Sequence, residues 1–237
     1  MTHVDLNLLA LDTSTDQLSV ALQRADGQRF AHTGAGGAQA SASLIPAVQA
    51  LLAQAGLSLS DLRAIAFGRG PGSFTGLRTA CSVAQGLAWG AGVPVLPIDT
   101  LLAVAEAARS AHGATHVLAL LDARMNEVYA AEYAWRDAAG WRPLSDIAVL
   151  APEAVPTPGA GAVLAGNAFA AYADRLPAAL QALPRIAALP SADALLNLAP
   201  ALLAAGAAVP AEQALPLYIR DKVAQTTAER SAAGLAR

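Results

Sequence analysis

The sequence predicts an α/β fold built of mixed sheets flanked by helices. Short apolar runs of strand length alternate with longer segments whose apolar residues recur at helical spacing, which is typical of βαβ units. Hydrophobic residues make up 55% of the 237 residues and charged residues 14%, so the chain can bury a large core. A pattern of strand, aspartate, polar turn and strand also occurs twice, which suggests two related lobes.

The first half of the chain contains the clearest elements. Apolar runs bounded by polar or glycine-rich turns predict strands over 6–12, 18–23, 63–67 and 93–98. Apolar residues at helical spacing predict helices over 43–55 and 75–90, and a further helix that opens at Thr100. Because these strands and helices alternate, we expect them to form one layered lobe.

Residues at the ends of the first two helices match known capping preferences. Ser43 is expected to cap the first helix, which would place Pro46 in the first turn, where its missing amide hydrogen breaks no bond. Gly56 is expected to end this helix. Ser73 or Thr75 is expected to cap the second helix.

The second half begins with a segment that resembles the start of the chain. HVLALLDARMNEVYAAEY reads like LNLLALDTSTDQLSVALQ, with Asp122 in the place of Asp12. This similarity suggests an internal duplication, although hairpins with an acidic turn are common enough to leave the simpler explanation open. Beyond residue 150 the chain is rich in alanine and proline, and it predicts a strand over 162–165 and helices near 168–182 and 192–205.

The net charge of the chain argues against stand-alone binding of nucleic acid. The net charge is −3 and the fifteen basic residues are scattered along the chain. A protein that binds nucleic acid alone usually carries a basic face, because lysines and arginines supply most of its affinity. We therefore expect any contact with nucleic acid to occur only as part of a complex.

The N-terminus and the cysteine content predict a cytoplasmic protein. The segment MTHVDLNLLALDTST lacks a basic region and contains two aspartates, which argues against a signal peptide. No apolar run approaches the roughly 18 residues of a membrane-spanning helix, so we expect no membrane association. Cys81 is the single cysteine, so no intramolecular disulfide can form, and its place in an alanine-rich helix indicates a packing role.

The segment GRGPGSFTGLR, residues 68–78, places a glycine-rich turn between a predicted strand and a predicted helix. It lacks the lysine of a Walker loop, the third glycine of a dinucleotide loop and the flanking glycines of a nucleophile elbow. Backbone amides around Gly70, Gly72 and Ser73, together with the helix dipole, could still hold a phosphate. The simpler alternative is a tight turn that brings helix and strand close together.

Two acidic turns are candidate polar sites. Asp12, at the end of a predicted strand, is followed by Thr13 and Ser14, and this set suits a magnesium–water shell or phosphate oxygens. An Asx turn, in which the side chains bind the hairpin backbone, explains these residues equally well. The corresponding residues of the second half are Asp122, Arg124 and Glu127. For them a surface ion-pair cluster is the default interpretation.

The string HGATH resembles a metal-binding pair of histidines. Gly113 is expected to end a helix between His112 and His116, so the two imidazoles need not face together. No glutamate follows the first histidine, as it does in zinc peptidases. The sequence therefore predicts no metal site.

Several stretches give the chain a resemblance to a known family. LLALDTSTDQLSVAL, FGRGPGSFTGLRTACSVAQGLA, LLDARMNEVYAAEY and PLYIRDKVAQ resemble the TsaB (YeaZ) family and occur in the order expected there. Together with LIPAVQALLAQAG they span nearly the whole chain. The stretch PGSFTGLR is highly specific to that family, whereas the middle of the second half is the least diagnostic part.

The resemblance implies the actin-like/Hsp70-like ATPase (ASKHA) fold. In this fold two duplicated ribonuclease-H-like lobes each contain a mixed sheet flanked by helices, so the resemblance favours the duplication. Residues 1–108 are then expected to form an N-terminal lobe that binds a partner. Residues 109–237 are expected to form a C-terminal lobe that is a degenerate repeat of the first.

The resemblance also implies a function. Members of the family are non-catalytic paralogues of TsaD, which transfers threonylcarbamoyl to the adenosine 3′ of the anticodon in ANN-decoding tRNAs. TsaD-type proteins carry a metal-binding His-x-x-x-His, and the aligned residues here are Thr100 and Val104, which cannot supply imidazole ligands. The expectation is an accessory subunit with no catalytic residue and no intrinsic cofactor. A stand-alone ATPase or an M22-type peptidase is the alternative.

The same resemblance predicts partners and a contact surface. TsaD, the ATPase TsaE and, through the complex, tRNA are the expected partners, and a homodimer is the alternative to a monomer for the isolated chain. ATP or ADP with magnesium is expected only at the contact with TsaD. The predicted contact residues are Leu44, Val48, Leu51, Arg78, Ala80 and Ala84. Each of their helices must also pack on its own sheet, so these positions could instead be core.

Overall fold

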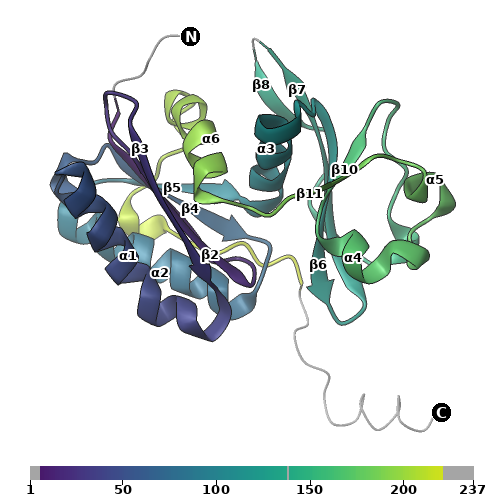
Figure 1. Cartoon of the computed structure of the whole chain (residues 1–237), viewed down its shortest axis with the longest axis horizontal. Coiled ribbons are helices and arrows are strands. Elements are labelled where there is room, and N and C mark those ends of the chain that lie inside the picture. Colours follow the sequence, from purple (N-terminus) through teal and green to yellow (C-terminus); the bar gives the residue numbers. More distant parts are fainter. Residues whose placement is uncertain (1–5, 138, 221–237) are drawn as a thin grey trace, which may run out of the picture.

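The computed structural model describes residues 6–137 and 139–220, and within them the chain forms two sheets flanked by helices (Figure 1). Two helices cover the outer face of the first sheet, two more lie between the sheets, and short helices cover the outer face of the second sheet. The predicted α/β class is confirmed.

The first sheet has the strand order β3-β2-β1-β4-β5. Its strands are β1 (Leu8–Asp12), β2 (Gln17–Gln23), β3 (Arg29–Ala35), β4 (Ala64–Gly70) and β5 (Val95–Asp99). The first three strands form an antiparallel meander, whereas β4 and β5 add parallel to β1. This makes β1 the central strand, and all of its residues are buried.

The second sheet has the order β11-β10-β6-β7-β8, with β9 also paired to β7. Its strands are β6 (His116–Arg124), β7 (Glu127–Arg136), β8 (Gly140–Pro143), β9 (Ala148–Leu150), β10 (Val163–Gly166) and β11 (Arg185–Ala187). Counted outward from β6, the pairing is antiparallel on one side and parallel on the other, as it is around β1. The shared connectivity confirms two ribonuclease-H-like lobes.

The helices form the layers around these sheets. They are α1 (Ala40–Ala55), α2 (Phe74–Ala91), α3 (Thr100–His112), α4 (Ala168–Tyr172), α5 (Ala178–Gln181) and α6 (Ala192–Ala204). Figure 1 shows α1 and α2 on one side of the first sheet and α3 and α6 between the two sheets. Among the described residues, none of these helices has the length and hydropathy needed to span a bilayer.

The pleat of β1 distributes its side chains between two cores. Leu9 and Leu11 point to the core under α1 and α2, whereas Leu8 and Ala10 point to the core under α6. Alternation of this kind is the ordinary geometry of a strand buried on both faces. The two faces of the second sheet likewise carry one core shared with α3 and another shared with α4 and α5.

The N-terminus of α1 differs from the prediction. The helix begins at Ala40 and follows directly from a 3₁₀ turn over Gly37–Gln39, so Ser43 lies inside it and does not cap it. Pro46 is consequently an interior residue of the helix. The predicted end of the helix is confirmed, because Gly56 adopts the left-handed conformation with φ of 64°.

Several further elements differ from the sequence-based expectation, including the short strands β8, β9 and β11, which were not predicted. Strand β3 was not predicted, because most of its side chains are exposed and it lacks a clear apolar alternation. The single helix expected near 168–182 is divided into α4, a 3₁₀ turn and α5. Pro177, at the N-cap of α5, explains the break, because a proline disfavours helical geometry in the residue before it.

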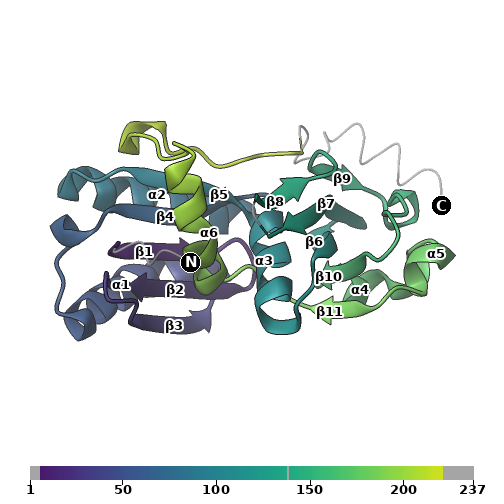
Figure 2. The ribbon, with the colours of Figure 1, turned by 90° about the horizontal axis from the view of Figure 1, so that it is seen from above.

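The chain after α6 returns to the first sheet before it reaches the second lobe (Figure 2). Val209 forms a β-bridge with Val95, and the N–H of Leu217 donates to the Arg69 carbonyl (2.7 Å). Helix α6 itself packs on β1 and β2. The division into lobes at residues 1–108 and 109–237 stays a prediction. Helix α6 and the chain after it, which belong to the second range, pack on the first sheet.

Candidate functional site

A cleft of about 550 Å³ lies between the lobes, where the β1–β2 turn faces the β6–β7 turn. The glycine-rich loop before α2, the start of α4 and the chain from Leu217 to Arg220 complete its walls. The predicted site residues that line it are Ser14, Gly72, Ser73, Asp122 and Arg124. Asp12 and Thr13 are buried behind the wall. The structure thus brings together the acidic turns of both lobes and the glycine loop.

Asp12 is a buried carboxyl at the end of β1, with 1% of its surface exposed. Its Oδ1 accepts hydrogen bonds from the Ser14 N–H (2.9 Å) and the Ser14 hydroxyl (2.7 Å), which is the geometry of an Asx turn. Its Oδ2 has no hydrogen-bond partner among the described residues, and a Cβ at Gly68 would overlap this atom. Burial raises the pKa of Asp12, and the hydrogen bonds from Ser14 offset only part of that rise.

The raised pKa of Asp12 predicts a pH dependence of stability. The folded protein holds the Asp12 proton more tightly than the unfolded chain, so this group stabilises the fold below its ordinary pKa of 3.8. That contribution is lost as the pH rises through the folded pKa. Since Asp12→Asn cannot ionise, its free energy of unfolding at neutral pH is expected to exceed that of the wild type by about 1 kcal/mol or more.

Urea unfolding at several pH values measures this gap, which should widen as the pH rises from 3.8. Asp61→Asn is the matched control, because hydrogen bonds from Ser58 lower the pKa of the exposed Asp61 carboxyl. The control should therefore change stability in the opposite direction. A gap for Asp12→Asn that is constant over this range would show that Asp12 is not strained by burial.

The glycine-rich loop packs directly on the β1–β2 turn. The N–H of Ser73 donates to the Ser14 carbonyl (2.7 Å), and the Thr13 hydroxyl donates to the Gly76 carbonyl (2.7 Å). A Cβ at Gly72 would overlap the Ser14 carbonyl oxygen, and a Cβ at Gly76 would overlap the Thr13 carbonyl oxygen. These glycines therefore permit the close approach of two backbones, which is the simpler of the two explanations offered by the sequence.

The actin-like fold implies a magnesium nucleotide between the lobes, but the residues of this cleft do not fit one. The Gly70 N–H donates to the Thr100 hydroxyl (3.1 Å), and the Ser73 N–H is taken by the Ser14 carbonyl. The Ser73 hydroxyl caps α2, where it accepts from the Gly76 N–H (3.4 Å). The phosphate role predicted for Asp12, Thr13, Ser14, Gly70, Gly72 and Ser73 stays a prediction that these contacts do not support.

Charged side chains of the second lobe are paired across and beside the cleft. Arg124 contacts Asp16 of the first lobe (2.8 Å) and Asp122 of its own turn (3.2 Å). Glu127 forms an ion pair with Arg220 from the end of the described chain. These pairs match the surface ion-pair interpretation of Asp122, Arg124 and Glu127. They also neutralise the two arginines that line the cleft.

The apolar contact residues predicted for a partner lie in the core of this chain. The side chains of Leu44, Val48, Leu51, Ala80 and Ala84 are buried between α1, α2 and the first sheet. The prediction was wrong for these positions, because the apolar stripe of a surface helix faces its own sheet. A partner on these helices must contact the opposite face.

That opposite face carries residues that the sequence reasoning missed. Ile45 on α1 is 42% exposed and Trp89 near the end of α2 is 69% exposed. Arg78, the one predicted contact residue that is exposed, stacks over the Phe74 ring (4.0 Å) and donates to the Tyr218 hydroxyl (3.0 Å). Ile45 follows the buried Leu44 in α1, and successive residues of a helix are turned by about 100° from each other. From this spacing the sequence could have indicated that Ile45 faces away from the core.

Comparison with known proteins places the chain in a family. A sequence-family model described as TsaD, tRNA N6-adenosine threonylcarbamoyltransferase, matches residues 31–228. The Escherichia coli K12 protein named tRNA threonylcarbamoyladenosine biosynthesis protein TsaB is 39% identical over 224 residues, which covers 92% of this chain and 96% of that protein. The chain belongs to the TsaB (YeaZ) family.

Two further TsaB family comparisons agree with this assignment. The TsaB of Haemophilus influenzae Rd is 49% identical over 125 residues, covering 53% of this chain and 52% of that protein. The solved structure of YeaZ from Pseudomonas aeruginosa superposes with a TM-score of 0.83 at 43% identity. That match covers 90% of this chain and 99% of the other, so the two lobes are shared throughout.

The TsaB family resemblance aligns Thr100 and Val104 with the metal-binding histidines of TsaD-type proteins. Both residues are buried in α3. The Thr100 hydroxyl accepts from the Gly70 N–H and so anchors the glycine loop, whereas Val104 packs in the core beneath the second sheet. The anchoring role was missed, although Thr100 directly follows the strand that pairs with β4.

The histidines of HGATH do not act together. His112 is exposed at the end of α3, and Gly113 ends that helix with φ of 71°. His116 begins β6, where its Nε2 contacts Glu132 (2.7 Å). Among the described residues, no group of three or more histidine, cysteine, aspartate or glutamate side chains is placed to hold a metal ion. The buried thiol of Cys81 donates to the Ala214 carbonyl (3.3 Å).

Proposed function

We propose that this chain is a non-catalytic subunit required for threonylcarbamoyl modification of tRNA. Membership of the TsaB family supports a role in tRNA threonylcarbamoyladenosine biosynthesis, since curated relatives carry that name. The observation that carries the non-catalytic part is the packing of the glycine loop. Its glycines and amides serve contacts with the β1–β2 turn and Thr100, and they do not form an open phosphate cradle.

The proposed partners are TsaD and the ATPase TsaE. TsaD would transfer threonylcarbamoyl to the adenosine 3′ of the anticodon in ANN-decoding tRNAs, and this chain would scaffold and activate it. The net charge of −3 supports tRNA contact only through the complex. ATP or ADP with magnesium is proposed to bind at the contact with TsaD, since the chain's own cleft does not fit it. A homodimer and a cytoplasmic location remain predictions.

The stand-alone alternatives find little support in the site. An ATPase would need loop amides and a carboxylate directed at the nucleotide, whereas Asp12 is buried behind the cleft and the Ser73 N–H is occupied. An M22-type peptidase would need imidazole ligands at the positions of Thr100 and Val104. These observations concern the residues of the site, and they leave the accessory role as the function that the geometry supports best.

Binding to TsaD tests the proposed contact surface. Ile45→Asp places a charge on the exposed face of α1 and is expected to weaken the affinity for TsaD at least about tenfold. Ala179→Asp is the matched control, because Ala179 is exposed on α5 of the second lobe and should leave the affinity unchanged. Calorimetric titration of each folded variant with purified TsaD gives the result. Unchanged affinity for Ile45→Asp would place the contact elsewhere.

A further inference from the structure

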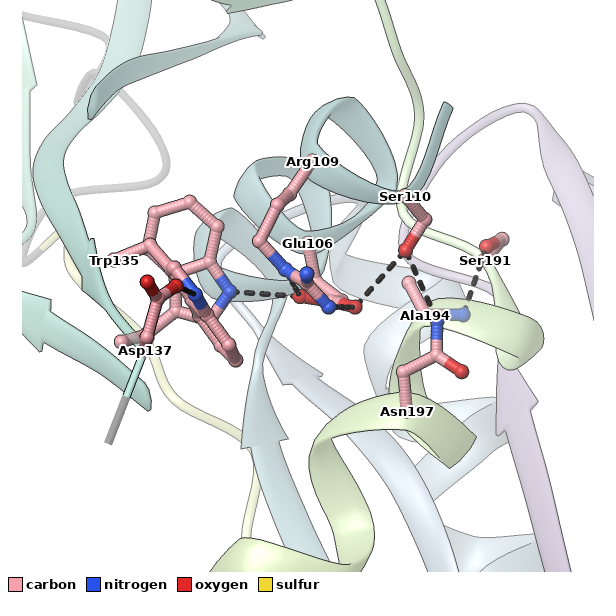
Figure 3. Close-up of polar contacts among 9 residues, drawn as sticks. Glu106, Arg109, Ser110, Trp135, Asp137, Ser191, Ala194 and Asn197 are labelled. Atoms are coloured by element: carbon pink, nitrogen blue, oxygen red, sulfur yellow. Dashed lines mark hydrogen bonds and ion pairs between the residues drawn. The ribbon is translucent and has the colours of Figure 1, made fainter. Parts of the chain in front are cut away.

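Helix α3 carries a buried carboxylate, Glu106, at the junction of the two lobes (Figure 3). Only 1% of its surface is exposed. Its Oε2 accepts from Arg109 Nε (2.9 Å) and Trp141 Nε1 (2.8 Å), and its Oε1 accepts from Arg109 Nη2 (2.8 Å) and the Ser110 hydroxyl (2.9 Å). Both oxygens therefore receive two hydrogen bonds each.

This environment keeps Glu106 ionised in the folded protein. Burial alone would raise its pKa, but hydrogen bonds from Arg109, Trp141 and Ser110 and the Arg109 charge outweigh burial, so the pKa lies below the ordinary value of 4.5. Asp137 is the other charged group that acts on Arg109. Hydrogen bonds to a buried carboxylate are directional. The donors therefore lose binding energy if they move away from it.

The donors come from different layers of the molecule. Trp141 belongs to β8 of the second sheet, and Arg109 stacks on Trp135 of β7 at 4.0 Å. On the other side, the exposed Ser110 accepts a hydrogen bond from the exposed Asn197 of α6 (3.0 Å), the helix that packs on the first sheet. Figure 3 shows Trp135 on one side of Glu106 and Asn197 of α6 on the other. One carboxylate thus connects elements of both lobes.

Apolar contacts around Glu106 also join the two lobes. Leu102 and Trp141 pack against both inter-sheet cores, the one shared with α6 and the one shared with the second sheet. Leu101 and Val104 of α3 are fully buried in the core shared with the second sheet, and Ala103 and Ala107 pack in the core shared with α6. Burial of such surface is favourable but non-directional, so it tolerates small rotations. The Trp141 indole is the exception, since its N–H is held by Glu106.

The other polar contacts between the lobes involve more exposed carboxylates. The segment whose Leu217 N–H binds the Arg69 carbonyl continues to Arg220, which pairs with Glu127, whose side chain is 38% exposed. Arg124 and Asp16 meet across the cleft at 2.8 Å, but their side chains are 70% and 86% exposed. Exposed ion pairs are screened by water and contribute little to a fixed geometry. Glu106, at 1% exposure, is the most buried carboxylate among these contacts, so its hydrogen bond from Trp141 is the least screened by water.

We propose that Glu106 fixes the relative orientation of the two lobes. Its hydrogen bonds connect β8 of the second sheet with α6, the helix that packs on the first sheet, and this set of contacts is called the brace below. Glu106 does so by holding the Trp141 ring in both cores and by positioning Ser110 for Asn197. The two lobes then move as one body. The proposal concerns the chain alone and does not depend on the proposed partners.

Distances between spin labels test the brace in the full chain. Cysteines replace the exposed Ser60 and Ala179, one in each lobe, in a Cys81→Ala background. The labelled protein with an intact Glu106 should give one narrow distribution of distances between the two labels. Glu106→Gln should lose that narrow peak and give a broad distribution, because the ion pair with Arg109 and one of the two acceptor oxygens are lost. Leu44→Ala, buried far from the brace, should lower the melting temperature and keep the narrow peak.

A second variant keeps the test decisive should Glu106→Gln fail to fold. Trp141→Phe removes the indole N–H donor while it retains an aromatic ring and the Glu106–Arg109 pair. It should fold and broaden the distribution, though less than Glu106→Gln. A narrow distribution at the wild-type distance in folded Glu106→Gln, or in folded Trp141→Phe, would overturn the proposal.

Discussion

Gly76→Ala is expected to lower the free energy of unfolding by about 3 kcal/mol or more. A methyl group at this position would overlap the carbonyl oxygen of Thr13, which belongs to the backbone and cannot rotate away. Relief requires the start of α2 to move from the β1–β2 turn. That movement would break the hydrogen bond from the Thr13 hydroxyl to the Gly76 carbonyl.

Gly86→Ala provides the control within the same helix. A Cβ at Gly86 meets no atom within 4 Å, and the residue lies in the interior of α2. Replacement of such a glycine by alanine should raise the free energy of unfolding by about 0.5–1 kcal/mol. Urea unfolding followed by circular dichroism measures both variants. Equal stabilities for the two would mean that the loop does not pack on the turn as the structure shows.

Leu51→Asp is expected to cost about 4 kcal/mol or more and to prevent folding under many conditions. Leu51 is buried in the core between α1 and the first sheet, so the substitution removes apolar contacts and buries a carboxylate. Most domains have a free energy of unfolding of about 5–15 kcal/mol, so this change removes a large part of it. Loss of partner binding in this variant would follow from misfolding.

Ala50→Asp is the matched control for Leu51→Asp. Ala50 is the preceding residue of α1 and is exposed, so the same aspartate remains in water there. Its effect on stability should lie within about 0.5 kcal/mol. Thermal unfolding and circular dichroism distinguish the two. A folded Leu51→Asp protein with near wild-type stability would contradict the placement of Leu51 in the core.

Most of the fold could be predicted because its local and global patterns agree. The apolar runs of β1 and β4 and the helical spacing of α2 each predict the element that forms. The hairpin of β6 and β7 could be matched to that of β1 and β2 from sequence alone. The shared strand order of the two sheets then confirmed the duplication that the pattern had left open.

The elements that escaped prediction lack such local patterns. Strand β3 exposes most of its side chains and is held chiefly by its pairing with β2, so its hydrophobic pattern is weak. The start of α1 depends on the 3₁₀ turn over Gly37–Gln39, which overrides the capping preference of Ser43. In both elements, contacts with the rest of the fold determine the structure more than the local sequence does.

The sequence predicted which residues of the candidate site lie close together, but not which contacts they make. Asp12, Ser14 and the glycine loop do meet, as their positions at strand ends suggested. Whether they face the cleft or one another depends on distances between backbones, which spacing along the chain does not reveal. Glu106 was missed for the same reason, because its partners Trp141 and Asn197 come together only through the packing of α3.

Transfer of threonylcarbamoyl to tRNA, measured with purified components, tests the central claim most directly. TsaD and TsaE are incubated with substrate tRNA and threonylcarbamoyl adenylate, with and without this chain, and the chain is also assayed without TsaD. We expect no transfer by the chain alone and restored transfer when it joins TsaD and TsaE. Substantial transfer by the chain in the absence of TsaD would contradict its non-catalytic role.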